Sequence, residues 1–400
     1  MERKMEEFLP IVLGSDLNTY SIAREIHEAY AIKPVVATSM ILLPCIDSDI
    51  INVYRKENFS KDPAVFKEVL DKIYNDNKDK YKDFIIFAPD DVMRTYALAN
   101  IGMLSFNPIM PYASNEVIKQ ISTKNDFYKR IEDLGLAPKT FVANSQNYKD
   151  LPYPDEVFIK PDNDVFYKSL DFEGQQKGYH SKSKSQTLEI LQMIFDAGYD
   201  YNILVQEFLA GGDGSEYSVE GYRSENALSM AIAKNILLDK RVEWIGNFVA
   251  KIDSDEKILY EYGRKIVENL GIYGLFNIDF KKDTRTGKYY AFEVNLRQGR
   301  SHYFATLNGV NTSKLAIEDR IFGREEELLG DKAFRYYNLD LDQTIDNLEV
   351  ELRDEFEEED RKNNSTNPLV YEKDWNLKRR IKIKKYLNKL SKETFAVKEI

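Results

Sequence analysis

The chain has 400 residues, a length that exceeds one ordinary hydrophobic core and predicts two or three domains. It carries 67 acidic and 56 basic side chains, a formal net charge of −11, which argues against nucleic acid as its main partner. Its single cysteine, Cys45, cannot build a disulfide framework and indicates a reducing compartment. Since we find neither a signal peptide nor an apolar run long enough to span a membrane, we expect a cytoplasmic protein.

The first 114 residues alternate predicted strands with predicted helices. Apolar strands are expected at 10–14, 33–39, 51–55 and 83–91, and helices at 17–30, at 62–74 and up to Gly102. This alternation predicts an N-terminal α/β domain with a doubly wound parallel sheet. Gly14, Ser15 and Asp16 fall at the first strand-to-helix turn, where open sheets bind ligands, so we predict that they contact the substrate. They lack the three-glycine fingerprint of a dinucleotide site.

The pattern changes after residue 115. A helix is expected over 115–135, ending at Gly135. Strands separated by Gly and Asp follow at 155–162, 202–223, 227–238, 274–283 and 288–297, with helices near 186–197 and 255–270. The sequence DTRTG at 283–287 predicts a hairpin turn between the last two strands. We therefore expect an antiparallel α+β region, divided into a linker helix with a central lobe (115–210) and a C-terminal lobe (211–335).

The C-terminal region, 336–400, is strongly charged. Residues 339–364 are acidic in net charge, whereas 374–390 are basic and place Ile383, Leu387 and other apolar residues on one helical face. Two interpretations stay open. The helix packs on its own acidic neighbour as a solvated extension, or it contacts an anionic membrane surface or an anionic substrate at the inner face of the membrane.

The last hairpin carries side chains that an apolar strand does not need. In YYAFEVNLRQGR (289–300), strand alternation places Glu293 and Asn295 on one face. Asp279 lies on the paired strand, so two carboxylates and an amide are predicted to converge. Such hard oxygen ligands favour Mg²⁺ bound with ATP over zinc. The plainer alternative is a pair of polar side chains on a solvated strand face.

Two lysines and a glycine-rich turn extend this site. Lys160 ends an apolar strand and Lys124 begins a helix, and both are placed to reach nucleotide phosphates. Gln206 and Glu207 end another apolar strand ahead of a glycine-rich turn. This hinge can offer a carboxylate and main-chain groups to an adenine edge.

The order of these features resembles the ATP-grasp superfamily of carboxylate–amine ligases, and within it the D-aspartate ligases of Gram-positive peptidoglycan synthesis. The likeness runs from residue 8 to about 315. It is carried by EEFLPIVLGSDLNTYSIARE, FIKPDND, LVQEFLAGGDGS, FNIDFK and, above all, FEVNLRQGRSHYFATLNGVN. It implies an ATP-grasp fold, with a small lid lobe and an antiparallel catalytic lobe that hold ATP between them.

The resemblance also implies roles for single residues. Two Mg²⁺ ions are assigned to Asp279, Glu293 and Asn295, and the phosphates of ATP to Lys124 and Lys160. Further ATP contacts fall on Gln206, on Glu207, on the backbone of Leu209 and, at the ribose, on Glu216. Arg297 and Arg300 match the catalytic arginines near the γ-phosphate and the activated carboxylate, and Ser301 and His302 are expected to contact the substrate beside them.

One segment departs from the family pattern. Many ATP-grasp enzymes carry a loop of small residues over the phosphates, whereas this chain reads SLDFEGQQKGYHSKSKS there. Within it, Lys177 is the residue expected to reach a phosphate.

The implied activity joins the β-carboxylate of D-aspartate, activated by ATP as an acyl phosphate, to the lysine side-chain amine of a UDP-linked muropeptide (UDP-MurNAc-pentapeptide). Two alternatives remain. One is a carboxylate–amine ligase for another amino acid or acceptor, outside the cell wall. The other is a nucleotide-binding regulator without turnover, which would have little need of the full set of metal ligands and arginines.

Overall fold

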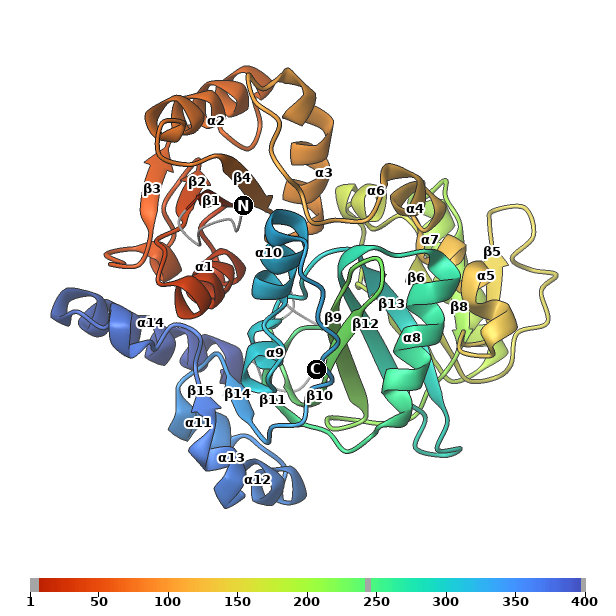
Figure 1. Cartoon of the computed structure of the whole chain (residues 1–400). Coiled ribbons are helices and arrows are strands. Elements are labelled where there is room, and N and C mark those ends of the chain that lie inside the picture. The colour runs from red at the N-terminus through yellow and green to blue at the C-terminus, as the bar shows by residue number, and fades with distance from the viewer. Residues whose placement is uncertain (1–6, 242–245, 397–400) are drawn as a thin grey trace.

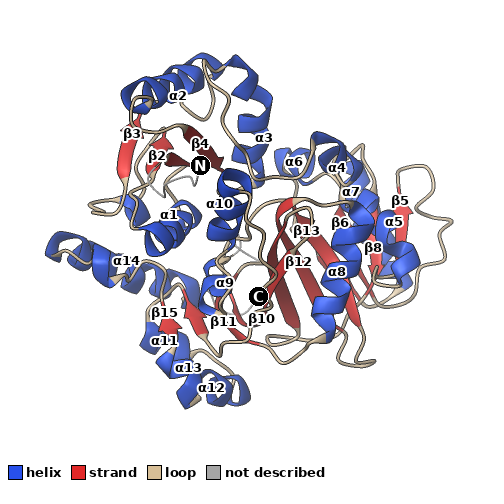
Figure 2. Cartoon of the chain, in the orientation of Figure 1, coloured by secondary structure: helices blue, strands red, loops and turns tan. Residues whose placement is uncertain are grey.

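The computed structural model describes residues 7–241 and 246–396. The described residues form three β-sheets (Figure 1): a parallel sheet at the N-terminus, a small antiparallel sheet and a large, mostly antiparallel sheet. Helices lie around all three sheets, as the colouring by secondary structure shows (Figure 2). None of the helices in these two ranges has the length and apolar character to cross a membrane.

The N-terminal sheet has four parallel strands in the order β3-β2-β1-β4, so the predicted alternation is confirmed. Its elements are β1 (Phe8–Leu13), α1 (Leu17–Tyr30), β2 (Val35–Thr38), η1 (Leu43–Cys45), β3 (Asn52–Arg55), α2 (Pro63–Asn77), β4 (Asp83–Phe87), α3 (Asp91–Asn100) and η2 (Ile101–Met103). The turn from β1 to α1 needs Gly14, whose φ is +86°. Asp16 then caps α1 by accepting from the Thr19 amide at 3.0 Å.

The small sheet has the strand order β5-β8-β6-β7. It comprises β5 (Thr140–Ala143), β6 (Val157–Pro161), α6 (Asp164–Ser169), β7 (Tyr179–Ser181), α7 (Lys184–Asp196) and β8 (Ile203–Glu207). The single helix predicted over 115–135 is wrong, because the segment forms α4 (Asn115–Gln120), α5 (Lys124–Ile131) and η3 (Glu132–Leu134). The break arises where the Thr123 side chain accepts from the Asp126 amide at 3.1 Å and starts a new helix.

The large sheet has seven strands in the order β13-β12-β9-β10-β11-β14-β15. They are β9 (Glu216–Arg223), β10 (Leu228–Leu238), β11 (Phe248–Asp253), β12 (Gly274–Lys282), β13 (Tyr289–Asn295), β14 (Arg335–Tyr337) and β15 (Ser365–Thr366). On one face, α8 (Ile258–Leu270) shares a core with Val219, Met230 and Ile278. Ala231 and Ala233 face the other way, toward α9 (Tyr303–Leu307) and α10 (Thr312–Phe322) and the N-terminal domain.

The C-terminal region is built differently from the expected helical extension, because it adds β15 and most of β14 to the large sheet. Its helices are α11 (Leu341–Asp346), α12 (Val350–Phe356), α13 (Glu359–Asn363), η5 (Glu372–Asp374) and α14 (Leu377–Phe395). Ile383 and Leu387 of α14 are buried in the core shared with the N-terminal domain, so the apolar stripe is used inside the protein. Lys378 and Lys382 pair with Asp47 of the N-terminal domain at 2.8 and 2.7 Å. The end of α14 packs on the acidic neighbour 339–364, where Leu390 joins a core with Leu339 and Leu352, so this interpretation is confirmed for that end.

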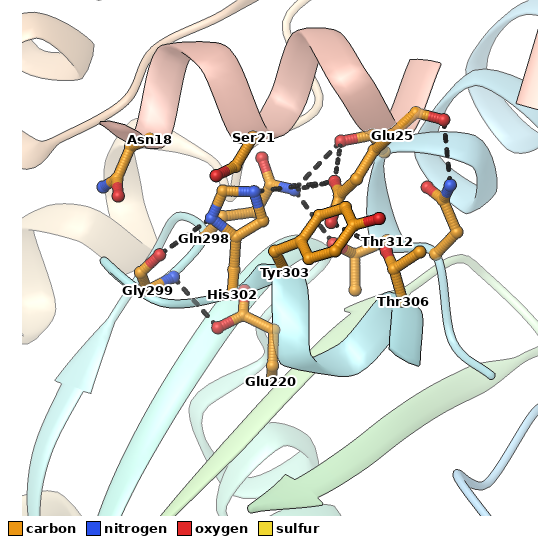
Figure 3. A network of polar contacts seen from close by, with 12 residues as sticks. Asn18, Ser21, Glu25, Glu220, Gln298, Gly299, His302, Tyr303, Thr306 and Thr312 are labelled. Atoms are coloured by element: carbon orange, nitrogen blue, oxygen red, sulfur yellow. Dashed lines mark hydrogen bonds and ion pairs between the residues drawn. The ribbon is translucent and has the colours of Figure 1, made fainter. Parts of the chain in front are cut away.

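A buried polar network joins the N-terminal domain to the large sheet (Figure 3). The carboxylate of Glu25, in α1, is fully buried and accepts hydrogen bonds from Gln298 Nε2 at 3.1 Å, Thr306 Oγ1 at 2.8 Å and Ser313 Oγ at 2.6 Å. These three donors belong to the loop after β13, to α9 and to α10. One side chain of α1 therefore fixes the whole segment that follows the hairpin.

His302 is the second titratable group of the network, and its hydrogen bond sets which of its ring nitrogens carries the proton. Its Nδ1 lies 2.9 Å from the Gly299 carbonyl oxygen, which can only accept, so Nδ1 carries the proton and Nε2 is an acceptor. Nε2 lies 3.6 Å from Glu25. Burial raises the pKa of Glu25 to about 8 and lowers the pKa of His302 to about 4. Near neutral pH the pair is therefore a carboxylic acid beside a neutral imidazole.

A second buried contact anchors α14. Arg379 and Asp374 are fully buried and lie 3.0 Å apart. Asp374 also accepts from the Tyr20 hydroxyl at 2.6 Å, while Arg379 donates to the Ile46 carbonyl oxygen at 2.9 Å. Because Tyr20 lies in α1 and Ile46 follows η1, a buried ion pair ties the C-terminal helix to the N-terminal domain.

Glu25→Gln tests the protonation of the network. Because the folded pKa of about 8 exceeds the ordinary 4.5, the stability that the neutral acid confers is complete below pH 4.5 and is lost as the pH rises to about 8. Glutamine does not ionise, so the Tm of the variant relative to wild type should increase between pH 5 and pH 9. The exposed Glu116→Gln variant is the control, and a Glu25→Gln difference as flat with pH as that of the control would contradict the assignment.

Asp374→Ala tests the anchor of α14. Removing one partner of a buried ion pair leaves an unpaired charge and costs about 3–5 kcal/mol. We expect a lower Tm and earlier proteolytic cleavage near the C-terminus. Glu393→Ala, which breaks the exposed contact with Lys389 at 3.5 Å, should change stability by less than about 1 kcal/mol. Equal losses in the two variants would show that the buried pair is not the anchor.

Candidate active site

The β12–β13 hairpin brings the predicted metal ligands together. Asp279 lies directly opposite Glu293, and a β-bulge follows, at which Phe292 has no partner strand residue. The bulge lets Glu293 and Asn295 face the site while Ala291 stays in the core. The two carboxylates and the amide thus share one face, as the strand pattern predicted, and their role as ligands stays a prediction.

A buried lysine reaches the same face from β11. Lys251 Nζ donates to Ser218 Oγ at 2.8 Å, and that hydroxyl donates to Asp279 at 2.9 Å. Burial lowers the pKa of Lys251 to about 8, although Asp279 and Glu220 favour its charge. An ammonium group has three donors, so Lys251 can also bind a phosphate oxygen. Sequence reasoning missed it, and its place inside the apolar strand FVAKID was the available signal.

Glu220 of β9 fixes the path of the loop that leaves β13. The Gly299 amide donates to Glu220 Oε2 at 2.9 Å (Figure 3). A Cβ at Gly299 would lie 2.9 Å from that oxygen and 3.1 Å from Asn277, so the approach favours glycine. Burial raises the pKa of Glu220 well above 4.5. Glu220 was also missed, because nothing in the sequence pairs it with a residue 79 positions away.

Asp279, Glu293 and Asn295 fit a hard divalent cation. Burial, and then the charge of Glu293, raise the pKa of Asp279 to about 6, so a cation between the two carboxylates would relieve their repulsion. Asn295 Oδ1 accepts from Arg297 at 3.1 Å and keeps a second lone pair. Over 7–241 and 246–396, no group of three or more His, Cys, Asp or Glu side chains could hold a metal.

Of the predicted phosphate lysines, Lys160 lies on β6 of the small lobe and Lys124 lies on α5, which packs on the core of the large sheet. Lys160 Nζ donates to the Tyr128 hydroxyl at 2.6 Å, and that hydroxyl donates to the carbonyl oxygen of the bulge residue Phe292 at 2.7 Å. Lys124 lies in the first turn of α5, as predicted, close enough to Asp162 for their charges to interact. Lys160 is therefore connected to the hairpin through one tyrosine.

The predicted adenine hinge follows β8. Glu207 Oε1 accepts from the Lys139 amide at 2.8 Å, and Gln206 Nε2 donates to Thr140 Oγ1 at 2.9 Å, so both side chains are engaged within the small lobe. Among the residues that the structure describes, the main chain of Leu209 makes no hydrogen bond. Its N–H and C=O groups can therefore serve an adenine edge.

Two further predicted ATP contacts lie at the border between the lobes. Glu216, at the start of β9, pairs with Lys281 at 3.1 Å, and its charge also acts on Asp279. Lys177 is exposed in the loop before β7, and a Cβ placed on Gly246 would lie 3.4 Å from its Nζ. This loop of the small lobe thus reaches the β10–β11 connection of the large sheet.

Arg297, in the loop after β13, forms an ion pair with a residue of the N-terminal domain. Its Nε and Nη2 lie 3.0 and 2.7 Å from Asp91 Oδ2, at the start of α3, and Nη2 also donates to Asn295. Arg94 donates to the Leu296 carbonyl oxygen at 2.9 Å and fixes the same stretch. Burial opposes the charge of Arg297, but Asp91 and the nearby carboxylates outweigh it and raise its pKa. Asp91 was not predicted, because its partner lies 206 positions away.

Arg300 faces a different part of the interface. Its charged and titratable neighbours are Asp16, at the β1–α1 turn, Tyr336 of β14, and Asp239 and Arg241 after β10. Burial lowers the pKa of Arg300, because removing the guanidinium group from water destabilises its charged form. The two predicted arginines thus have different surroundings, with Arg297 beside the predicted metal ligand Asn295 and Arg300 near the predicted substrate turn.

The remaining predicted substrate residues lie in the β1–α1 turn and in the loop after β13. Ser15 Oγ donates to the Met40 carbonyl oxygen at 2.6 Å, and the Gly14 amide donates to the Ala37 carbonyl oxygen at 2.9 Å. Ser301 is 9% exposed and His302 is fully buried in the network of Glu25. Their contact with a substrate stays a prediction, since each is already engaged or enclosed within the protein.

Comparison with known proteins identifies the family and the fold. A scan against models of protein families finds no match. The chain is 33% identical over 328 residues to the D-aspartate ligase of Enterococcus faecium (strain Aus0004), covering 80% of this chain and 78% of that enzyme. It is 27% identical over 221 residues to the carbamoyl phosphate synthase large chain of Methanobrevibacter smithii, covering 52% of this chain and 20% of that one.

Solved structures show the fold. The L-amino acid ligase from Bacillus licheniformis superposes with a TM-score of 0.52 at 14% identity, covering 79% of this chain and 74% of that one. The biotin carboxylase domain of the Hydrogenobacter thermophilus 2-oxoglutarate carboxylase gives a TM-score of 0.57 at 12% identity, covering 79% and 70%. The predicted ATP-grasp fold and the predicted ligase class, which forms a carbon–nitrogen bond with ATP, are therefore confirmed. The chain belongs to the D-aspartate ligase family of ATP-dependent carboxylate–amine ligases.

Proposed function

We propose that this protein uses ATP and Mg²⁺ to activate the β-carboxylate of D-aspartate and joins it to the lysine side-chain amine of a UDP-linked muropeptide. The observation that carries the proposal is the common face of the large sheet, where Asp279, Glu293 and Asn295 stand beside Lys251 and Arg297. The identity to a D-aspartate ligase over most of the chain supports the choice of amino acid.

In the first step, a carboxylate oxygen of the amino acid attacks the γ-phosphorus, the bond from that phosphorus to the oxygen of ADP breaks, and an acyl phosphate forms. Ammonium groups for the phosphates come from Lys124, Lys160 and Lys251. Asp279, Glu293 and Asn295 would hold Mg²⁺, two ions in this proposal, which when bound would neutralise phosphate charge. Arg297 is charged and fixed by Asp91, so it can stabilise the transferred group without reorganising.

In the second step, the amine attacks the acyl carbon, the bond from that carbon to the phosphate oxygen breaks, and the amide, inorganic phosphate and a proton are released. Water would hydrolyse the acyl phosphate before the amine arrives. The small lobe, whose Lys177 loop reaches the β10–β11 connection, is the part of the chain that can exclude it.

A dicarboxylic amino acid keeps one carboxylate that does not react. In a partly closed site this anion needs a cation, since an unpaired buried charge is costly. Arg297 lies at the predicted metal ligands, where its Nη2 donates to Asn295, whereas Arg300 lies further along the loop, where the charge of Asp16 at the predicted substrate turn acts on it. We therefore assign the spare carboxylate to Arg300, whose planar donors suit a bidentate contact.

Glu293→Gln and Asn295→Ala test the metal ligands. Each variant should lower ADP release by about 100-fold or more, because phosphate charge is then poorly neutralised. Both should keep a Tm close to wild type, since the side chains lie on the polar face of the sheet. Lys288→Ala, at the exposed turn of the same hairpin, should keep full activity. Wild-type ADP release in either ligand variant would remove this site from the proposal.

The amino acid is tested by ADP release and product mass at constant ATP, Mg²⁺ and lysine-containing UDP-muropeptide. D-aspartate should give a product heavier by one aspartyl residue, and L-aspartate or D-alanine much less. Arg300→Lys should raise the KM for aspartate more than the KM for ATP, because a point charge replaces a planar fork. A strong preference for an amino acid with one carboxylate would defeat both assignments.

A further inference from the structure

Helix α5 contacts both lobes of the predicted ATP site. Through Tyr128 and other apolar side chains it packs on the core of the large sheet. Its first turn carries Lys124, and the next amide, that of Asn125, donates to Asp162 Oδ1 at 3.1 Å. Asp162 directly follows β6 of the small lobe, two residues after Lys160. The helix that presents one predicted phosphate lysine is therefore bonded to the end of the strand that carries the other.

Tyr128 makes a second bond between α5 and that strand. It lies four residues after Lys124, so the two side chains share a face of the helix. Its hydroxyl lies 2.7 Å from the carbonyl oxygen of Phe292, which can only accept, so the hydroxyl proton points to that oxygen. The lone pairs of the hydroxyl are then left to accept from Lys160 Nζ at 2.6 Å. Burial raises the pKa of Tyr128, so this arrangement keeps its proton near neutral pH.

The main chain to which Tyr128 donates is itself fixed. Strand β13 is an edge strand of the large sheet, and the amide of Ala291 donates to the Leu136 carbonyl oxygen, just after α5, at 2.9 Å. The bulge residue that follows Ala291 is the one bonded to Tyr128, and it directly precedes the predicted metal ligand Glu293. Two hydrogen bonds through one buried hydroxyl therefore set the position of the Lys160 ammonium group relative to the metal-ligand hairpin.

We propose that Tyr128 is a positioning residue for ATP, which holds the ammonium group of Lys160 in place against the metal-ligand hairpin, so that α5 orders both predicted phosphate lysines. An ammonium group has three donors, so the contact with Tyr128 does not prevent Lys160 from binding a phosphate oxygen. This inference rests on the proposed function for the phosphate role of Lys160. It goes further in giving a role to a residue outside the sequence motifs that carry the family resemblance.

Tyr128→Phe removes one hydroxyl and keeps the packing of the ring. Calorimetric titration of a non-hydrolysable ATP analogue with Mg²⁺ into the full-length protein should show about fivefold or more weaker binding in the variant, because Lys160 loses its fixed acceptor. In turnover, the KM for ATP should rise and the KM for D-aspartate should stay within about twofold of wild type. Tyr260→Phe is the matched control, since it removes a hydroxyl of α8 that donates to the Gly330 carbonyl oxygen at 2.7 Å, and it should bind the analogue like wild type.

A double-mutant cycle with Lys160→Ala separates positioning from a merely structural role. Lys160→Ala should weaken binding of the analogue more than Tyr128→Phe does, and adding Tyr128→Phe to it should change the affinity by less than about twofold, since no lysine is left to position.

The inference would be overturned by losses that multiply in the double variant, by wild-type affinity in either single variant, or by a wild type that does not bind the analogue. ADP release by wild type with D-aspartate, measured in parallel, tests the proposed function separately. If the two losses are coupled but wild type releases no ADP with any amino acid, the positioning role stands and the proposed reaction fails.

Discussion

The loop that carries Arg297 and Arg300 is held by one buried carboxyl group, that of Glu25. Glu25 accepts a hydrogen bond from Gln298. On either side of Gln298, the Leu296 carbonyl oxygen accepts from Arg94 and the Gly299 amide donates to Glu220. Arg297 and Arg300 lie on either side of Gln298. Their different surroundings are therefore set by the contacts of this loop with the N-terminal domain and β9. A charged carboxylate would be expensive at full burial, and the neutral acid beside His302 avoids that cost.

The interface also explains why the N-terminal domain is part of the site. Asp91 pairs with Arg297 and orients it, and the negative charge of Asp16 stabilises the charged form of Arg300. The sheet contributes the rest through a bulge at Phe292, which turns Glu293 away from the core and offers its own carbonyl oxygen to Tyr128. One irregular residue thus links the metal ligands to the lysine of the small lobe.

Local patterns predicted much of this architecture. The strands of the N-terminal sheet, the hairpin and the shared face of Asp279, Glu293 and Asn295 depend on periodicity and turn residues within short windows. The helix break at Thr123 was missed because a single side-chain cap outweighed a continuous helical pattern. Short strands such as β5 and β7 were missed because three or four residues carry little periodicity.

Contacts between distant segments could not be predicted. Lys251, Glu220, Asp91 and Glu25 act through partners that tertiary packing brings close. The pattern of 374–390 predicted an apolar face and left open whether it packs on the protein, but it did not identify the N-terminal domain as a partner. The resemblance assigned roles to the candidate metal ligands and arginines by their motif, and those roles stay predictions. It ended near residue 315 and said nothing of the C-terminal region.

The central claim is that an aspartyl carboxylate is activated as an acyl phosphate on the face of the large sheet. It is tested most directly with D-aspartate carrying ¹⁸O in its β-carboxylate, supplied with ATP, Mg²⁺ and the muropeptide acceptor. Because the oxygen that attacks phosphorus leaves with it, one ¹⁸O atom should appear in inorganic phosphate for each amide formed. Amide formation with unlabelled phosphate would contradict the account.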